Sequence, residues 1–172
     1  MTLRRPPAEP RPVVGQVQPD RSRNVHATEY AASVRRLLGH LHEQPETVAW
    51  SSTTWARILS DPNRTILVAE DRGEFAVGTA DVLVVPNLTH DGAPWALVEN
   101  VVVDTGWRRR GVGRALLRHA IRVADDAGCY KLQLTSSDHR DEAHRFYERL
   151  GFTATSTGFR WSFRERERAG AA

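Results

Sequence analysis

The 172 residues, of which 40% are hydrophobic, suffice for one domain with a substantial core. No run of eighteen apolar residues occurs, so we expect no membrane-spanning helix, and prolines follow Arg4-Arg5 where a secretory signal needs an apolar segment. A single cysteine excludes an intramolecular disulfide, and together these features favour the cytoplasm. The net charge of +3 is too mild to favour nucleic acid as a partner.

The first half of the chain reads as alternating strands and helices. Positions 1–11 are rich in proline and arginine, so we expect a disordered arm before a single domain at 12–163. Hydrophobic patterning then predicts a strand at 12–17, a helix from Asn24, a helix capped by Ser51 or Ser52 and ending at Leu59, and a hairpin of strands 65–69 and 75–85. In the first helix one face carries Tyr30, Val34, Leu37, Leu38 and Leu41.

The second half continues the alternation. We predict a strand at 94–104, a helix at 111–127 closed by Gly128, a strand at 130–135, a helix at about 140–150, and two short strands ending at Phe163. Positions 164–172 alternate arginine and glutamate and then become small, which predicts a polar tail. The result is a mixed α/β sheet with helices on both faces.

The most informative stretch joins the strand that ends at Val103 to the helix that begins near Gly111. It contains three arginines and two spaced glycines. Glycine lets the backbone approach a ligand, and the first N–H groups of a helix, with adjacent guanidiniums, favour phosphate. We therefore predict a pyrophosphate site. Val112-Gly113 replace the lysine and hydroxyl of a P-loop, and Leu116 replaces the third glycine of a dinucleotide fingerprint, so neither nucleotide motif fits.

Three motifs in order carry a resemblance to a known family. Arg108-x-x-Gly111-x-Gly113 is similar to the Gln/Arg-x-x-Gly-x-Gly/Ala acetyl-CoA signature of the GNAT superfamily of N-acetyltransferases. Positions 98–103 and 129–135 resemble its fourth and fifth strands, and Phe146-Tyr147-x-x-x-Gly151-Phe152 resembles its late motif. The resemblance covers 98–163. It implies a mostly antiparallel sheet of six to seven strands, with acetyl-CoA as cosubstrate.

The resemblance also implies how the cosubstrate is held. Main-chain groups of the Val101–Val103 stretch would pair with the pantetheine arm between splayed strands, and helix-terminal N–H groups would hold the pyrophosphate. Relatives commonly carry Asn at the position of Arg140 for the pantetheine arm, which leaves that contact open. The expected cosubstrate-binding residues are Val101, Val102, Val103, Arg108, Arg109, Arg110, Gly111, Val112, Gly113, Arg114 and Ala115.

Two residues are candidates for proton transfer. Strand alternation predicts that Glu99 shares a face with Val101 and Val103, about 6–7 Å from Val101, where it would act as general base. The resemblance implies that Tyr147 is the general acid that protonates the CoA thiolate. A glutamate paired with an arginine and a tyrosine packed in the core are the structural alternatives. The seven histidines show no metal-ligand spacing, so we expect no metal.

The function predicted from these features is direct transfer of an acetyl group from acetyl-CoA to a primary amine of a small polar acceptor. A protein or peptide N-acetyltransferase and a non-catalytic acyl-CoA-binding sensor are the alternatives. Tyr30, Trp50, Trp55 and the segment 86–90 are candidates for the acceptor walls. We expect no membrane or nucleic-acid partner, and a homodimer remains open.

Overall fold

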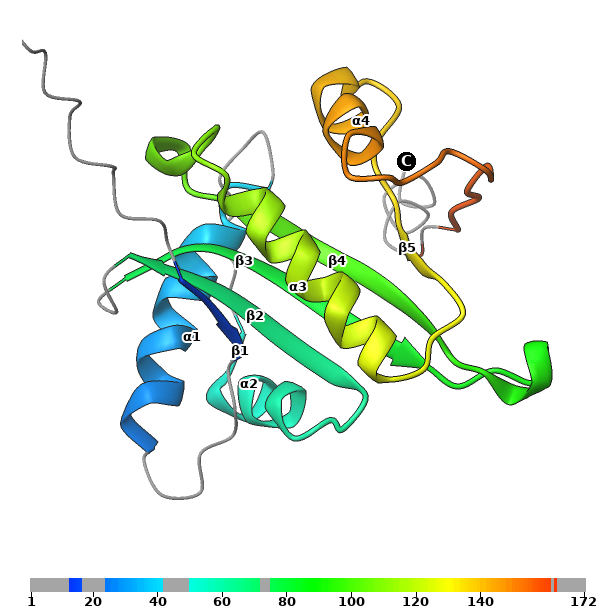
Figure 1. The fold of residues 1–172 in the computed structure, drawn as a ribbon. Helices are drawn as coiled ribbons and strands as arrows, with labels where there is room; N and C mark the ends of the chain where they lie inside the picture. The colour runs from blue at the N-terminus through cyan, green and yellow to red at the C-terminus, as the bar shows by residue number, and fades with distance from the viewer. Residues whose placement is uncertain (1–12, 17–23, 42–49, 72–74, 162, 164–172) are drawn as a thin grey trace, which may run out of the picture. The chain divides into compact units, whose positions relative to one another are not determined.

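The computed structural model describes residues 13–16, 24–41, 50–71, 75–161 and 163 (Figure 1). The predicted arm at 1–11 and the predicted tail at 164–172 lie outside the described residues. The chain forms two compact units that divide between Leu134 and Thr135, and each unit is described by itself. None of the described helices combines the length and apolar character that crossing a bilayer requires.

A five-stranded mixed sheet of order β1-β2-β3-β4-β5 forms the first unit. The first four strands pair as antiparallel neighbours in chain order, and the fifth lies parallel to β4. This confirms a mixed, mostly antiparallel sheet. The strands are β1 (Val13–Gln16), β2 (Arg64–Asp71), β3 (Phe75–Val85), β4 (Trp95–Val103) and β5 (Leu132–Leu134).

In the part of the chain that the structure describes, the sheet has fewer strands than the six to seven that the sequence predicts. Among the described residues, 152–161 contains no strand where two short ones were expected. The run from Thr153 to Gly158 consists of small, exposed residues, mostly threonine and serine. A strand is stable when it buries an apolar face or pairs with a neighbour, and this run has no apolar face to bury.

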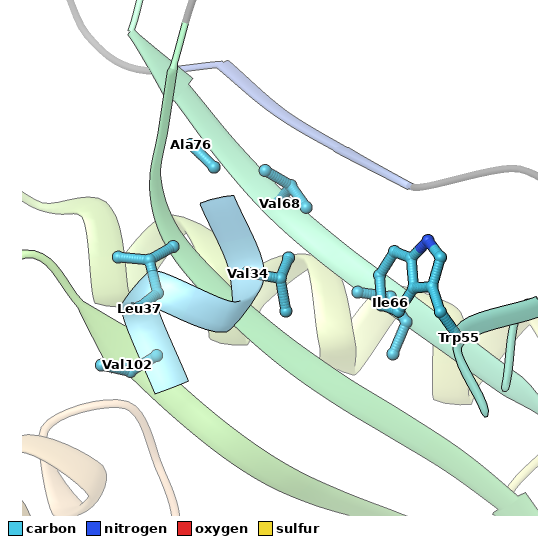
Figure 2. Packing of buried hydrophobic residues seen from close by; sticks show 7 residues of the cluster. All are labelled: Val34, Leu37, Trp55, Ile66, Val68, Ala76 and Val102. Atoms are coloured by element: carbon cyan, nitrogen blue, oxygen red, sulfur yellow. The ribbon is translucent and has the colours of Figure 1, made fainter. Parts of the chain in front are cut away.

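Helices cover both faces of this sheet, as predicted. Helices α1 (Asn24–Leu38) and α2 (Ser52–Leu59) pack on one face, and α3 (Val112–Asp126) packs on the other (Figure 1). Figure 2 shows the first of these interfaces, in which helix residues meet side chains of three strands. That core cluster consists of Val34, Leu37, Trp55, Ile66, Val68, Ala76 and Val102.

Local residue choices explain where these helices begin and end. The Ser51 hydroxyl accepts a hydrogen bond from Thr54 N at 3.1 Å and caps α2. Gly111, with φ of 86°, is the N-cap of α3, and Gly128, with φ of 69°, follows its last turn. The Cys129 N–H donates to Ala124 O at 2.9 Å and completes this end. Both ends of α3 therefore agree with the sequence prediction.

Close contact between β3 and the start of α3 depends on a missing side chain. A Cβ atom at Gly78 would lie 2.9 Å from Val112 Cγ1 and 3.2 Å from Val102 O. Real Cβ atoms essentially never show the first separation, and the second is tighter than nearly all real contacts, so a glycine here lets the helix rest directly on the strand. The first turn of α3 is thereby positioned against the sheet.

The second unit contains helix α4 (Asp141–Glu148), close to the predicted 140–150. After the helix, Gly151 takes φ of 98°, and the Phe152 N–H donates to Tyr147 O at 3.1 Å. The Tyr147 ring lies 5.5 Å from that of Phe146 and 6.0 Å from that of Phe152, between centroids. The late sequence motif thus forms one aromatic group at the end of α4.

Candidate active site

Strand β4 contains a bulge at the position where the sequence predicts regular alternation. Asp81 pairs with Glu99 but Thr79 pairs with Val102, so Asn100 and Val101 share the place opposite Ala80. Asn100 has φ of 55°, in the left-handed region that asparagine tolerates. Because Thr79 and Asp81 lie on one face of β3, so do Val102 and Glu99. The prediction that Glu99 shares a face with Val101 and Val103 is therefore wrong.

Beyond the bulge, β4 keeps an edge that β5 does not cover. The pairs between these strands end at Val98 and Leu134, whereas β4 continues to Val103. Asp104 N donates to Val77 O of β3 at 2.9 Å, so alternation turns the main-chain groups of Val103 and Val101 away from β3. Arg108 Nε approaches Val103 O at 3.4 Å from that outer side. The edge offers donors and acceptors to an extended ligand.

The start of α3 has the properties of an anion site. Ala115 N is the first to donate within the helix, to Gly111 O at 3.0 Å, so the N–H groups of residues 112–114 have no intrahelical acceptor. No side chain caps this end. Arg108, Arg109 and Arg110 are exposed beside it, and the Arg110 guanidinium lies 5.3 Å from the centroid of the Trp107 ring. These groups fit a diphosphate.

Asp104, which lies between the end of β4 and the anion site, connects this part of the chain to helix α1. Its carboxylate forms an ion pair with Arg36 of α1 and accepts from Gly106 N at 3.1 Å. Arg36 also donates to Ala76 O of β3 at 2.8 Å. The hydrogen bond from Arg36 is the main cause that lowers the pKa of Asp104. Sequence reasoning missed this pair, because 68 positions separate its members.

Glu99 lies half-buried on the face covered by α1 and α2. Burial raises its pKa, and the negative charge of Asp81 raises it further. Both effects increase the proton affinity of the carboxylate, which suits a general base. Val102, by contrast, is 5% exposed and belongs to the core cluster, so its side chain serves packing.

A pocket of about 110 Å³ opens on the same face as Glu99. Trp50 and Trp55, two predicted acceptor residues, line it and stack with their ring centroids 5.1 Å apart. Tyr30 packs against the same core, and its hydroxyl donates to Glu70. In the segment 86–90, the His90 ring lies against that of Tyr130, with the centroids 3.9 Å apart and the two planes tilted by 32°. The pocket is lined by Val34, Leu38, Trp50, Trp55, Ile58, Arg64, Ile66, Thr79, Asp81 and Asn100.

Tyr147, the predicted acid, is described within the second unit. Burial raises its pKa, an effect that the positive charge of Arg140 partly opposes. The hydroxyl therefore stays protonated at neutral pH and is able to donate. Arg140 takes the N-cap position of α4 without a side-chain capping bond. Among the described residues, no group of three or more His, Cys, Asp or Glu side chains is arranged to hold a metal ion.

The comparison that decides the family is a match to the model of the acetyltransferase (GNAT) family over residues 31–152. The chain belongs to this family. It is an acetyl-CoA-dependent N-acetyltransferase, and the resemblance inferred from the three sequence motifs is confirmed.

Individual relatives of this GNAT acetyltransferase include enzymes of known substrate. Glucosamine 6-phosphate N-acetyltransferase of Trypanosoma brucei brucei is 35% identical over 123 residues, which cover 69% of this chain and 79% of that enzyme. Ribosomal protein bS18-alanine N-acetyltransferase of Escherichia coli K12 is 26% identical over 113 residues, 66% and 70% of the two chains. A putative acetyltransferase from Agrobacterium tumefaciens C58 has a similar structure, with a TM-score of 0.71, 38% identity, and coverage of 76% and 92%.

Proposed function

We propose that this GNAT acetyltransferase transfers the acetyl group of acetyl-CoA directly to the primary amine of a small polar acceptor, an amino sugar phosphate of the glucosamine 6-phosphate type. The observation that carries the proposal is the half-buried Glu99 beside a strand edge that β5 leaves open. The similarity to the Trypanosoma enzyme supports the acceptor class.

The proposed donor site uses main-chain groups at both ends of the segment that joins β4 to α3. The outward groups of Val101 and Val103 hydrogen-bond to the pantetheine amides, as in strand addition. The N–H groups from Arg109 through Arg114 receive the pyrophosphate, and the guanidiniums of Arg108, Arg110 and Arg114 neutralise its charge. Acetyl-CoA is bound here as a substrate that the reaction consumes.

The proposed chemistry needs one base and one acid. Glu99 accepts a proton from the acceptor ammonium, directly or through a water molecule, and leaves a neutral amine. That amine attacks the thioester carbonyl, a C–N bond forms, and the C–S bond breaks when the tetrahedral adduct collapses. Tyr147 donates its proton to the departing thiolate, so CoA leaves as the thiol. The positively charged nitrogen formed by the attack then loses one proton, which restores the tyrosine hydroxyl, and the neutral amide remains.

A peptide acceptor is the second candidate, because the relative from Escherichia coli acetylates an alanine of a ribosomal protein. We further propose that 12–163 acts as one acetyltransferase domain, since the family match extends from the first unit into the second. A homodimer stays a prediction.

Calorimetric titration with acetyl-CoA, followed by release of free thiol with a panel of amines, tests this function. The panel contains glucosamine 6-phosphate, glucosamine, a polyamine and a peptide that begins with alanine. We expect binding with 1:1 stoichiometry and fastest release with the phosphorylated amino sugar. If thiol is released fastest with the peptide, the second candidate, a peptide acceptor, is supported instead. Binding without release for any amine would contradict both.

A further inference from the structure

A network of polar side chains links three neighbouring strands on the face that carries Glu99. Asp81 of β3 is 3% exposed, and Arg64 of β2 donates from Nε to its two carboxylate oxygens at 3.0 and 2.9 Å. A second nitrogen of Arg64 donates to the same carboxylate. From the other side, Asn100 Nδ2 donates to Asp81 Oδ2 at 3.4 Å. Asp81 thus joins β2 to the bulge residue of β4.

Stability alone does not explain a buried ion pair at this place. Removing the Asp81 charge and part of the Arg64 charge from water is costly, and well-packed apolar residues of similar volume often serve a fold equally well. The surroundings of Asp81 are apolar, since Ile66, Trp55 and Val34 line the same pocket. The arrangement around the pair is specific, however: Asp81 lies directly opposite Glu99 in the ladder and accepts from the residue that forms the bulge.

We propose that Asp81 is a positioning residue for acetyl transfer, which holds the β4 bulge through Asn100 and so fixes the direction of the Glu99 carboxylate. The inference rests on the proposed role of Glu99 as general base. Without the acceptor oxygen of Asp81, the Asn100 amide loses its partner and the left-handed backbone loses the contact that selects it. Glu99 precedes that residue directly, so its side chain turns with the bulge.

The charges around Glu99 support this assignment. Asp81 faces it from β3, Arg64 reaches Asp81 from β2, and β5 carries no charge. The described side chains of α1 and α2 contribute Arg35, Arg36 and Arg57; Arg35 lies over the Trp50 ring and Arg36 binds Asp104. Of these groups, Asp81 is the one whose charge raises the pKa of Glu99.

The Asp81→Asn variant separates charge from shape. The amide oxygen still accepts from Asn100, so the bulge keeps its partner, and we expect the pKa of Glu99 to fall because the neighbouring charge is gone. NMR titration of ¹³C-labelled glutamate carboxyls, with the signal assigned by Glu99→Gln, measures that pKa without any acceptor. Thr79→Val is the matched control: Thr79 is equally buried on the same face and donates to Leu67 O at 2.8 Å. This control is expected to leave the pKa unchanged.

The double variant Arg64→Met/Asp81→Leu removes the ion pair with volume conserved, so no unpaired charge is left to unfold the protein. It also removes the acceptor of Asn100. We expect turnover to fall about tenfold and the acidic limb of kcat/KM to move to lower pH. Wild-type turnover in the double variant, or an unchanged Glu99 pKa in Asp81→Asn, would overturn the inference. A lowered Glu99 pKa in a protein that acetylates no amine would confirm that Asp81 acts on Glu99 and would refute the proposed function instead.

Discussion

Two effects raise the pKa of the Glu99 carboxyl group. Burial and the charge of Asp81 both favour the protonated carboxyl, so the pKa lies above the usual glutamate value of 4.5. A base must be deprotonated to act. If Glu99 is the proposed base, we expect the rate to fall, as the pH is lowered, at a pH above that of an ordinary glutamate, and the acidic limb of the pH–rate profile to report this residue.

Replacing Glu99 by glutamine tests the base. We expect kcat to fall by about 10²–10⁴, with the acidic limb removed and the Kd for acetyl-CoA retained, because donor binding uses main-chain groups of other residues. Steady-state kinetics between pH 5 and 9 and calorimetry measure the two effects. Glu142→Gln, an exposed position in the first turn of α4, is the control. An acidic limb that survives in Glu99→Gln would assign it to another group.

Replacing Tyr147 by phenylalanine keeps the ring contacts with Phe146 and Phe152 and removes the hydroxyl alone. In the wild type, the pKa of the Tyr147 hydroxyl is raised above the usual 10. If it is the proposed acid, the hydroxyl stays able to donate until it loses its proton at high pH. We expect turnover to fall about 10²-fold and the basic limb to disappear. Tyr130→Phe, which keeps the stacking with His90, serves as control. Turnover equal to wild type would mean that Tyr147 serves packing.

At the scale of elements, the two ends of α3 provide a matched pair. Gly111 and Gly128 both have positive φ, and a Cβ atom at either position would meet nothing within 4 Å. Alanine at either glycine is expected to lower the free energy of unfolding by about 1–2 kcal/mol. Only Gly111→Ala is expected also to raise the Kd for acetyl-CoA, about tenfold or more, because it distorts the end that carries the free N–H groups. Denaturant unfolding and calorimetry compare them; equal Kd values would contradict the phosphate assignment.

Element positions were predictable where a local signal exists. Apolar spacing located the helices, Ser51 capped α2, and Gly111 and Gly128 bounded α3. The bulge was not predictable, because Val98 to Val103 reads as a regular strand and one inserted residue reverses every side chain after it. The ion pair near Glu99 was missed for another reason. Arg64 and Asp81 come from separate strands, and a side-chain contact between two strands leaves no periodic pattern in a single sequence.

At the scale of the whole molecule, the Arg36–Asp104 ion pair joins α1 to the segment that leads into the anion site. The pKa of Asp104 is lowered from its usual 3.8, so the folded state gains from ionisation. This stabilisation is present at pH values above the pKa that Asp104 has in the unfolded chain. It is lost as the pH falls through the lower pKa that Asp104 has in the folded state. Acid is therefore expected to weaken this ion pair.

The Asp104→Asn variant tests this connection. With side chains 47% and 22% exposed, the pair is screened, and we expect a loss of about 1 kcal/mol at neutral pH. The difference between wild type and variant is expected to shrink below pH 4. Urea unfolding at a series of pH values measures it, with the exposed Asp138→Asn as the reference. A difference independent of pH would exclude ionisation as its origin.

The bulge in β4 also separates two kinds of recognition along one strand. In the proposed mechanism, Glu99 and the bulge residue Asn100 present side chains to the acceptor, whereas Val101 and Val103 present backbone groups to the donor. Backbone recognition does not depend on which side chain stands at a position. On this proposal, we expect substitutions on the acceptor face to change the acceptor preference without changing the preference for acetyl-CoA. A designer seeking a new amine substrate would accordingly randomise the walls of the pocket and leave residues 101–115 untouched.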